Sequence, residues 1–210
     1  MIKNNTLTRP QDIRVDLRLI AEMVEPNSRV LDVGCADGTL LSHLIDTQNV
    51  DGRGIELSQS GVNSCVSKGL SVVQGDADAD LSDYPDKGFD YAILSQTLQA
   101  THRPKQVMEQ LLRVGKKAVV SFPNFAYWRC RSYLAFKGRM PMTSSLDYAW
   151  HETPNIHFCT LRDFTVLCED LNITIEKSII VANSGDVLTY PINSKRANFF
   201  AAQCVFMLRN

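Results

Sequence analysis

The sequence has no long apolar run, no excess of charge of either sign and no close group of cysteines. None of its apolar stretches is long enough to span a bilayer, and its first residues, MIKNNTLTRP, are too polar for a signal peptide. The sequence has 22 Lys and Arg residues and 23 Asp and Glu residues, so its net charge is −1. A protein of nearly zero net charge is not expected to bind nucleic acid or membrane surfaces in general. We therefore expect a cytoplasmic protein with neither a nucleic-acid nor a membrane partner.

The six cysteines lie too far apart to form a metal site or a redox motif. They include no Cys-x-x-Cys pair and no cluster with histidine. Isolated cysteines in a reducing compartment usually behave as small buried apolar side chains. We expect no disulfide and no metal at these positions, which are Cys35, Cys65, Cys130, Cys159, Cys168 and Cys204.

Short β-rich runs alternate with segments of helical periodicity along the chain. Its 210 residues, 44% of them hydrophobic, suit a single domain over residues 1–210. The alternation predicts an α/β fold in which helices cover both faces of a mostly parallel, seven-stranded sheet. The expected helices are residues 12–24, 39–46, 58–67, 103–114 and 160–171. The expected strands are residues 29–33, 52–56, 70–73, 89–94, 117–122, 173–181 and 198–208, the last two antiparallel.

Residues 123–158 interrupt this alternation. The stretch is rich in aromatic residues and proline, and it contains no evident long strand. Sheets of this type bind ligands at the carboxyl ends of their strands. Because the stretch directly follows the fifth strand, we expect it to be a lid or a partner-docking insertion.

The clearest candidate site combines the loop Asp32-Val-Gly-Cys-Ala-Asp-Gly38 with Glu56, at the end of the next strand. The glycines permit a sharp turn and a close approach of ligand to backbone, and a carboxylate about 20 residues on can accept from a ribose diol. The spacing fits a nicotinamide dinucleotide or S-adenosylmethionine (SAM), and a structural turn is the alternative without a ligand. Asp32 suits the cationic end of SAM better than a pyrophosphate, because like charges repel.

The third strand ends in a further acidic group, within Gln74-Gly-Asp-Ala77. If the loop and Glu56 hold the other parts of a nucleoside, Asp76 falls beside its adenine. A carboxylate there can accept from the exocyclic amine. The alternative is an exposed acidic turn.

These motifs, together with Phe89-Asp-Tyr-Ala-Ile-Leu-Ser95, resemble class I SAM-dependent methyltransferases over roughly residues 10–122. The sequence departs from that pattern at Ala36, where a middle glycine is common, and at Gln99-Ala100, where many relatives have histidine. Four further stretches resemble the methionine-biosynthesis MetW family: Ser95-Gln-Thr-Leu-Gln-Ala-Thr101, Ser121-Phe-Pro-Asn-Phe125, Gly138-Arg-Met-Pro141, and Thr153-Pro-Asn-Ile-His-Phe-Cys-Thr160 with Arg162-Asp-Phe164.

The resemblance implies a Rossmann-like class I methyltransferase fold and a SAM-binding protein of methionine biosynthesis that acts with a homoserine O-acyltransferase. The alternative is a SAM-dependent methyltransferase that acts on an unidentified small metabolite. Whether a methyl group is transferred is left open. SAM or S-adenosylhomocysteine is expected to contact Asp32, Gly34, Cys35, Ala36, Gly38, Glu56, Leu57, Asp76, Ala77 and Ser95.

No catalytic residue is assigned, because methyl transfer to a good nucleophile needs alignment more than a base. His151 could act as a general base, or His151 and His157 could pack within a lid. The candidate groups on the acceptor side are Asn124, Tyr127, Trp128, Tyr148, Trp150, His151 and His157.

Basic and aromatic residues alternate between Tyr127 and Arg139. Such a segment can bind a protein partner or RNA, or it can be a helix whose aromatic side chains are buried beneath its charges. The basic residues are Arg129, Arg131, Lys137 and Arg139, and the apolar ones are Tyr127, Trp128, Tyr133, Leu134 and Phe136.

Overall fold

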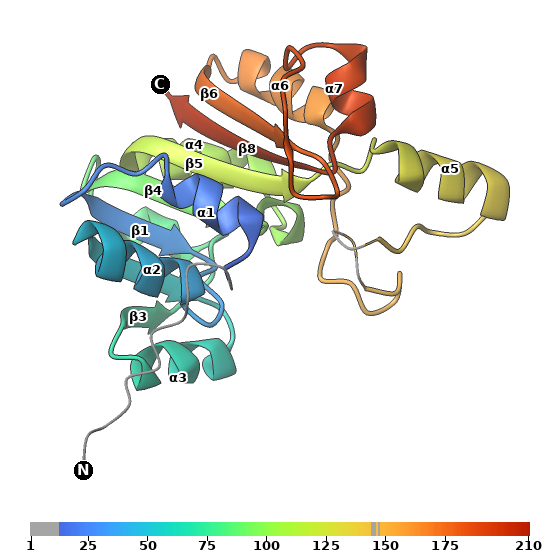
Figure 1. Ribbon diagram of the computed structural model, residues 1–210. Coiled ribbons are helices and arrows are strands. Elements are labelled where there is room, and N and C mark those ends of the chain that lie inside the picture. The colour runs from blue at the N-terminus through green and yellow to red at the C-terminus, as the bar shows by residue number, and fades with distance from the viewer. Residues whose placement is uncertain (1–12, 144–145, 147) are drawn as a thin grey trace.

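A single mixed sheet forms the centre of the molecule (Figure 1). The computed structural model describes residues 13–143, 146 and 148–210. The strands are β1 (Arg29–Val33), β2 (Asp51–Glu56), β3 (Ser71–Gln74), β4 (Phe89–Ser95), β5 (Gly115–Pro123), β6 (Thr174–Val181), β7 (Val187–Leu188) and β8 (Gln203–Arg209). In the described residues these eight strands lie in the order β3-β2-β1-β4-β5-β8-β6-β7.

The pairing of the strands confirms the expected α/β fold. Strands β1 to β5 pair in parallel, and β8 pairs antiparallel with both β5 and β6. The sheet has one strand more than expected, because Val187–Leu188 pairs with the end of β6 but is too short to show a sequence pattern. The last strand was expected from residue 198 but begins at Gln203, because Ser194 caps a short helix over Lys195–Phe200.

Three of the described helices begin at a capping side chain, namely Ser58, Thr160 and Ser194. The helices are α1 (Val15–Ala21), α2 (Thr39–Gln48), α3 (Gln59–Ser67), α4 (Pro104–Val114), α5 (Trp128–Lys137), α6 (Leu161–Asp170) and α7 (Lys195–Phe200), with 3-10 turns η1 (Asp80–Asp83) and η2 (Leu98–Ala100). Thr160 and Asp163 form a capping box at the start of α6, as its sequence predicts. Residue 12, where the first helix was expected to begin, lies outside the described residues. Over the described ranges, no helix is long and apolar enough to cross a membrane.

The two faces of the sheet bury separate apolar cores. Along β1 successive side chains alternate between them, so that Val30 belongs to the core that α1 and α2 cover, while Leu31 belongs to the core that includes residues of α4 and α6. Helices therefore cover both faces, as expected. Five of the six cysteines are buried in these cores and their surroundings, Cys159 is half-buried, and all six are free thiols.

Residues 124–160, which connect β5 to α6, form a segment that we call the arm. Figure 1 shows α5 and the chain that follows it extending away from the sheet. Residues 144, 145 and 147 of the arm, which fall within the expected insertion, lie outside the described residues. The arm contains a helix that the sequence analysis treated only as an alternative, α5.

The base of the arm is fixed by the buried side chain of Asn124, which is 1% exposed. Its Nδ2 donates to the carbonyls of Asn198 and Ala201, each over 2.9 Å. Its Oδ1 accepts from the amides of Ala126 and Leu161 over 3.1 and 3.0 Å. One amide thus connects the end of β5 to the starts of the arm and of α6 and to α7.

We expect Asn124→Ala to lower the free energy of unfolding by about 3 kcal/mol or more, because four main-chain groups lose their partner in a dry environment. Urea denaturation at neutral pH measures the loss. Asn155→Ala, which removes an amide of the same arm without such bonds, is the control and should change stability by less than about 0.5 kcal/mol. Equal stabilities of the two variants would contradict the role given to Asn124.

Candidate functional site

The loops that follow β1, β2 and β3 meet at the carboxyl edge of the sheet. The amides of Gly34 and Cys35 donate to the carbonyl of Ile55 over 2.8 and 3.1 Å. The amide of Gly75 donates to the carbonyl of Glu56 over 3.0 Å. These bonds bring the glycine loop, Glu56 and the start of the Asp76 turn together, as the sequence predicts.

The glycine loop turns through three residues with positive φ. Gly34 and Gly38 have φ of +74° and +76°, and Ala36 between them has φ of +50°. A side chain at Gly34 would place its Cβ 2.7 Å from Oγ1 of Thr97. Glycine adopts a positive φ without steric strain, which explains why the methyltransferase pattern has glycine at this position. Ala36 adopts the same left-handed conformation at a cost in free energy.

Glu56 is held in place by the loop that it faces. Its Oε2 accepts from the amide of Ala36 over 2.9 Å. Its Oε1 accepts from the amide and the hydroxyl of Ser58 over 2.9 and 2.7 Å. A carboxylate has about four acceptor positions. Glu56 is thus oriented by the protein and still has capacity for a ligand hydroxyl.

Asp32 is the most perturbed group of the site. It is 2% exposed, and its Oδ1 is buried without a hydrogen-bond partner in the described structure. Burial, and then the nearby charge of Glu56, raise the pKa of Asp32 to about 7. A carboxyl group so placed is costly to ionise unless a cation or a donor approaches it.

The remaining predicted site residues lie along the same edge. Asp76 is half-buried, and its Oδ1 accepts from the amide of Asp78 over 2.9 Å. Leu57 is 66% exposed directly after Glu56. Ala77 packs against the apolar core, and the hydroxyl of Ser95 lies 3.3 Å from that of Ser121. The alternative interpretation of Asp76 was an exposed acidic turn, but its side chain is only partly exposed.

Two further polar residues lie at this edge that were not among the predicted site residues. Asp16 of α1 is 2% exposed and accepts from Arg14 and from Nε2 of Gln96. Gln96, just after β4, has φ of +51° and joins α1 to the loop that packs against Gly34. A signal existed, since Asp16 lies on the apolar face of its helix, three residues after Ile13 and four before Ile20.

The arm reaches the same edge through Gln99. The amides of Ile156 and His157 both donate to the carbonyl of Gln99 over 2.9 Å. The side chain of Gln99 is 5% exposed, and its Oε1 has no partner in the described structure. This contact places the end of the arm next to the loop that follows β4.

Most acceptor-side candidates turn out to be structural or exposed. Asn124 is engaged with the main chain and Tyr127 is buried, whereas His151 and His157 are both exposed. The ring of His151 lies edge-on to that of Trp150, 5.4 Å away. Asn124 and Tyr127 are therefore poor candidates for contact with an acceptor, and the two histidines are not enclosed.

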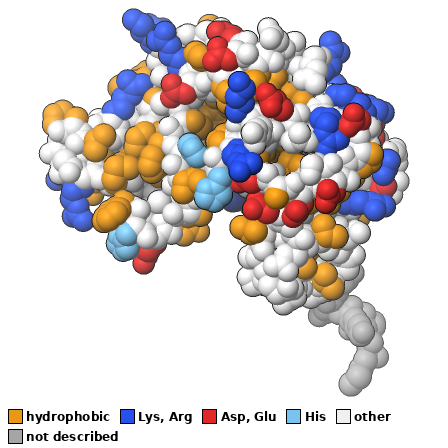
Figure 2. Space-filling model, turned by 180° about the vertical axis from the view of Figure 1, so that it is seen from behind, with side chains coloured by type: hydrophobic (Ala, Val, Ile, Leu, Met, Phe, Trp, Pro, Cys, Tyr) orange, Lys and Arg blue, Asp and Glu red, His pale blue; other side chains and the backbone are white. Residues whose placement is uncertain are grey.

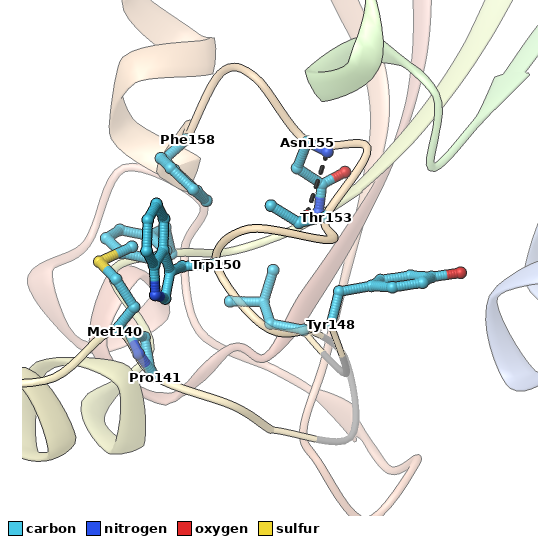
Figure 3. A pocket seen from close by; sticks show the side chains of 9 residues that line it. Met140, Pro141, Tyr148, Trp150, Thr153, Asn155 and Phe158 are labelled. Atoms are coloured by element: carbon cyan, nitrogen blue, oxygen red, sulfur yellow. Dashed lines mark hydrogen bonds between the residues drawn. The ribbon is translucent and has the colours of Figure 1, made fainter.

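The outer part of the arm encloses a very small aromatic cavity. Figure 3 shows Met140, Pro141 and Trp150 on the same side, while the ring of Tyr148 points away from them. The volume of about 20 Å³ accommodates about one water molecule. We therefore regard the cavity as part of the packing of the arm.

The basic aromatic segment buries Tyr127 but leaves its other aromatic side chains exposed. Trp128, Tyr133 and Phe136 are 37%, 37% and 86% exposed, so the interpretation as a helix with buried aromatics is wrong for α5 beyond Tyr127. Arg131 is tied to the base of the arm, because its Nε donates to the carbonyl of Ala126 and its guanidinium lies 5.7 Å from the ring of Phe199.

Neither metal chemistry nor a thiol nucleophile is indicated at the site. Among the described residues no group of three or more His, Cys, Asp or Glu side chains could hold a metal ion. Burial and the charge of Asp32 raise the pKa of the Cys35 thiol, so this thiol stays protonated. The chemical groups at this edge are the buried carboxyl of Asp32, the oriented carboxylate of Glu56 and the main-chain amides of the glycine loop.

A model of the family described as "Methionine biosynthesis protein MetW" matches residues 14–208. The chain belongs to the MetW family. A relative from Rhodopirellula baltica, the "Bifunctional methionine biosynthesis protein MetXA/MetW", is 35% identical over 181 residues. The match covers 81% of this chain and 29% of that relative, so the chain spans less than a third of the longer protein.

Solved structures confirm the methyltransferase fold. A SAM-dependent methyltransferase from Mesorhizobium loti superposes with a TM-score of 0.69 at 14% identity, covering 95% of this chain and 99% of the other. A SAM-dependent methyltransferase from Archaeoglobus fulgidus gives 0.65 at 17% identity, covering 92% and 91%. At such identities the likeness concerns the fold alone.

The raised pKa of Asp32 predicts a pH dependence of stability. The pKa is about 7 in the folded protein and near 3.8 without the protein environment, so between these values the folded state holds a proton that the unfolded chain has released. The free energy of unfolding should therefore fall as pH rises towards 7, by about 1.4 kcal/mol per pH unit, and then level off.

Urea denaturation of the ligand-free wild type and of Asp32→Asn between about pH 5 and pH 8 measures this effect. Other carboxylates titrate in both proteins, so the difference between the two isolates Asp32. That difference should change with pH up to about 7 and remain constant above it. A difference independent of pH would show that Asp32 ionises normally.

Proposed function

We propose that this protein binds SAM or S-adenosylhomocysteine at the carboxyl edge of β1, β2 and β3. The observation that carries the proposal is the buried, unpartnered Oδ1 of Asp32 beside the glycine loop. The amino group of the methionine moiety is a cation, and a cation there would favour the ionised carboxyl and lower its pKa. The methyltransferase fold supports this choice of ligand.

The order of the groups along the edge gives the orientation of the ligand. The methionine moiety would lie against Asp32 and the loop to Gly38, and the ribose at Glu56. The adenine would lie near Asp76, with the exposed side chain of Leu57 available for apolar contact. Gly34, Cys35, Ala36, Ala77 and Ser95 would complete the surroundings of the ligand.

Bound SAM would supply an electrophilic methyl group, and none of the acceptor-side candidates is assigned a role in its transfer. Asn124 and Tyr127 serve the packing of the arm, and His151 and His157 are exposed. Methyl transfer to a small metabolite remains the alternative, and turnover of labelled SAM with a cell extract tests it.

We further propose that the partner in methionine biosynthesis is a homoserine O-acyltransferase, and that the arm docks it. The relative named MetXA/MetW combines two proteins in one chain, of which this chain matches 29%. Proteins that occur fused in one organism commonly act together in others. The supporting surface is a group of exposed apolar side chains on the arm: Leu134, Phe136, Met142, Tyr148, Trp150, Ile156 and Phe158.

Monomeric proteins rarely expose so many large apolar side chains on one segment. Figure 2 shows hydrophobic side chains gathered over the lobe that contains the arm, with basic side chains at its margins. Phe136 and Trp150 are 86% and 73% exposed. Large exposed apolar patches mark sites of interaction, and aromatic residues carry much of the binding energy when they are buried.

We expect Glu56→Ala to weaken the binding of S-adenosylhomocysteine by roughly 1.5–3 kcal/mol, because the ribose hydroxyls lose a charged acceptor. Isothermal titration calorimetry measures the affinity. Glu22→Ala, which removes an exposed carboxylate elsewhere, is the control and should leave it unchanged. Unchanged affinity in Glu56→Ala would contradict the assignment of the ribose, and selective binding of NAD would contradict that of the ligand.

Phe136→Glu should weaken the complex with the homoserine acyltransferase of the same organism about tenfold or more, because it places a charge in an apolar contact. Affinity is measured by biolayer interferometry. Val66→Glu on α3 is the control, since it puts the same charge at an exposed apolar position away from the arm. A complex insensitive to Phe136→Glu would exclude the arm, and no complex with the wild type would exclude the partnership.

A further inference from the structure

A second concave surface lies at the base of the arm, distant from the predicted SAM site. The groove has a volume of about 810 Å³, within the range of small-molecule sites. It lies between α6, α7 and the start of α5. Strands β4 and β5 separate β1 from the part of the sheet that α6 and α7 cover. The groove is lined by Arg131, Arg162, Thr165, Val166, Glu169, Ile192, Asn193, Ser194, Lys195, Arg196, Asn198, Phe199 and Phe200.

The groove concentrates positive charge in a chain whose net charge is −1. Arg131, Arg162, Lys195 and Arg196 line it together with a single carboxylate, Glu169. Within the described part of the chain, none of these four cations takes part in an ion pair. Unpaired cations that face one concave surface from three different segments favour a ligand with more than one negative charge.

The rest of the lining adds apolar walls and an unused polar group. Phe199 and Phe200 are 39% and 42% exposed, with their rings 5.1 Å apart and nearly perpendicular. The side-chain Oδ1 of Asn198 is buried and has no hydrogen-bond partner in the described structure. A buried acceptor of this kind needs a donor, such as a hydroxyl group of a ligand.

We propose that this groove binds an organic diphosphate of the nucleoside diphosphate class. Its two phosphates provide adjacent charges for the four cations, and guanidinium groups match phosphate oxygens in a bidentate manner. Its hydroxyls provide donors for Asn198, and its flat base packs against the exposed phenylalanines. The site is separate from Asp32 and Glu56 and is independent of SAM binding.

The test uses ADP as the probe and the full chain saturated with S-adenosylhomocysteine, so that the adenine position of the other site is filled. Calorimetry at low ionic strength should detect ADP binding that weakens as salt is added. Adenosine, which lacks the phosphates, should not bind measurably. Arg162→Glu combined with Arg196→Glu should weaken ADP binding about tenfold or more, because two charges at the groove are reversed.

Lys105→Glu is the matched control, because Lys105 is an exposed cation on α4 outside the groove. It should change ADP affinity less than about twofold. ADP binding in the Glu56→Ala variant should equal that of the wild type, which separates this site from the proposed SAM site even if that assignment fails. Thermal unfolding confirms that each variant is folded.

Three results would overturn the proposal. The first is the absence of ADP binding to the wild type, and the second is binding that the double charge reversal leaves unchanged. The third is tighter binding of a hexaglutamate peptide than of ADP with the same dependence on Arg162 and Arg196. That result would assign the groove to an acidic protein segment instead.

Discussion

The way the chain leaves the sheet after β5 depends on one buried amide, that of Asn124. A chain that leaves a parallel sheet at β5 must satisfy its main-chain groups before it can extend into solvent, because buried unpaired groups are costly. Asn124 satisfies four such groups at once and so connects the starts of the arm and of α6 to the end of α7. This contact therefore helps to position both the exposed apolar surface of the arm and the groove between α6, α7 and the start of α5.

At the opposite part of the same edge the controlling constraint is electrostatic. Burial, and then the nearby charge of Glu56, raise the pKa of Asp32, and among the described residues Glu56 has donors whereas Oδ1 of Asp32 has none. The protein thereby keeps one carboxylate oriented and leaves the other with an unsatisfied oxygen. Such an arrangement stores free energy that a cationic ligand can recover on binding, which is a common property of functional sites.

The contact of Gln99 with the end of the arm connects these two parts of the molecule. The loop that follows β4 carries Gln96, which contacts α1, and Gln99, which receives the arm through the amides of residues 156 and 157. The loop after β4 is therefore in contact with α1 through Gln96 and with the arm through Gln99.

The fold class, the first five strands and the loop of Asp32 could be predicted from the sequence, because these depend on local periodicity and on glycine at fixed positions. The sequence also predicts that Glu56 and Asp76 follow neighbouring strands. Packing in three dimensions decides that Oδ1 of Asp32 has no partner among the described residues, that Asn124 is structural and that the aromatic residues of α5 are exposed. These properties depend on which groups from distant segments pack together, and a pattern of single residues along the chain carries no record of such contacts.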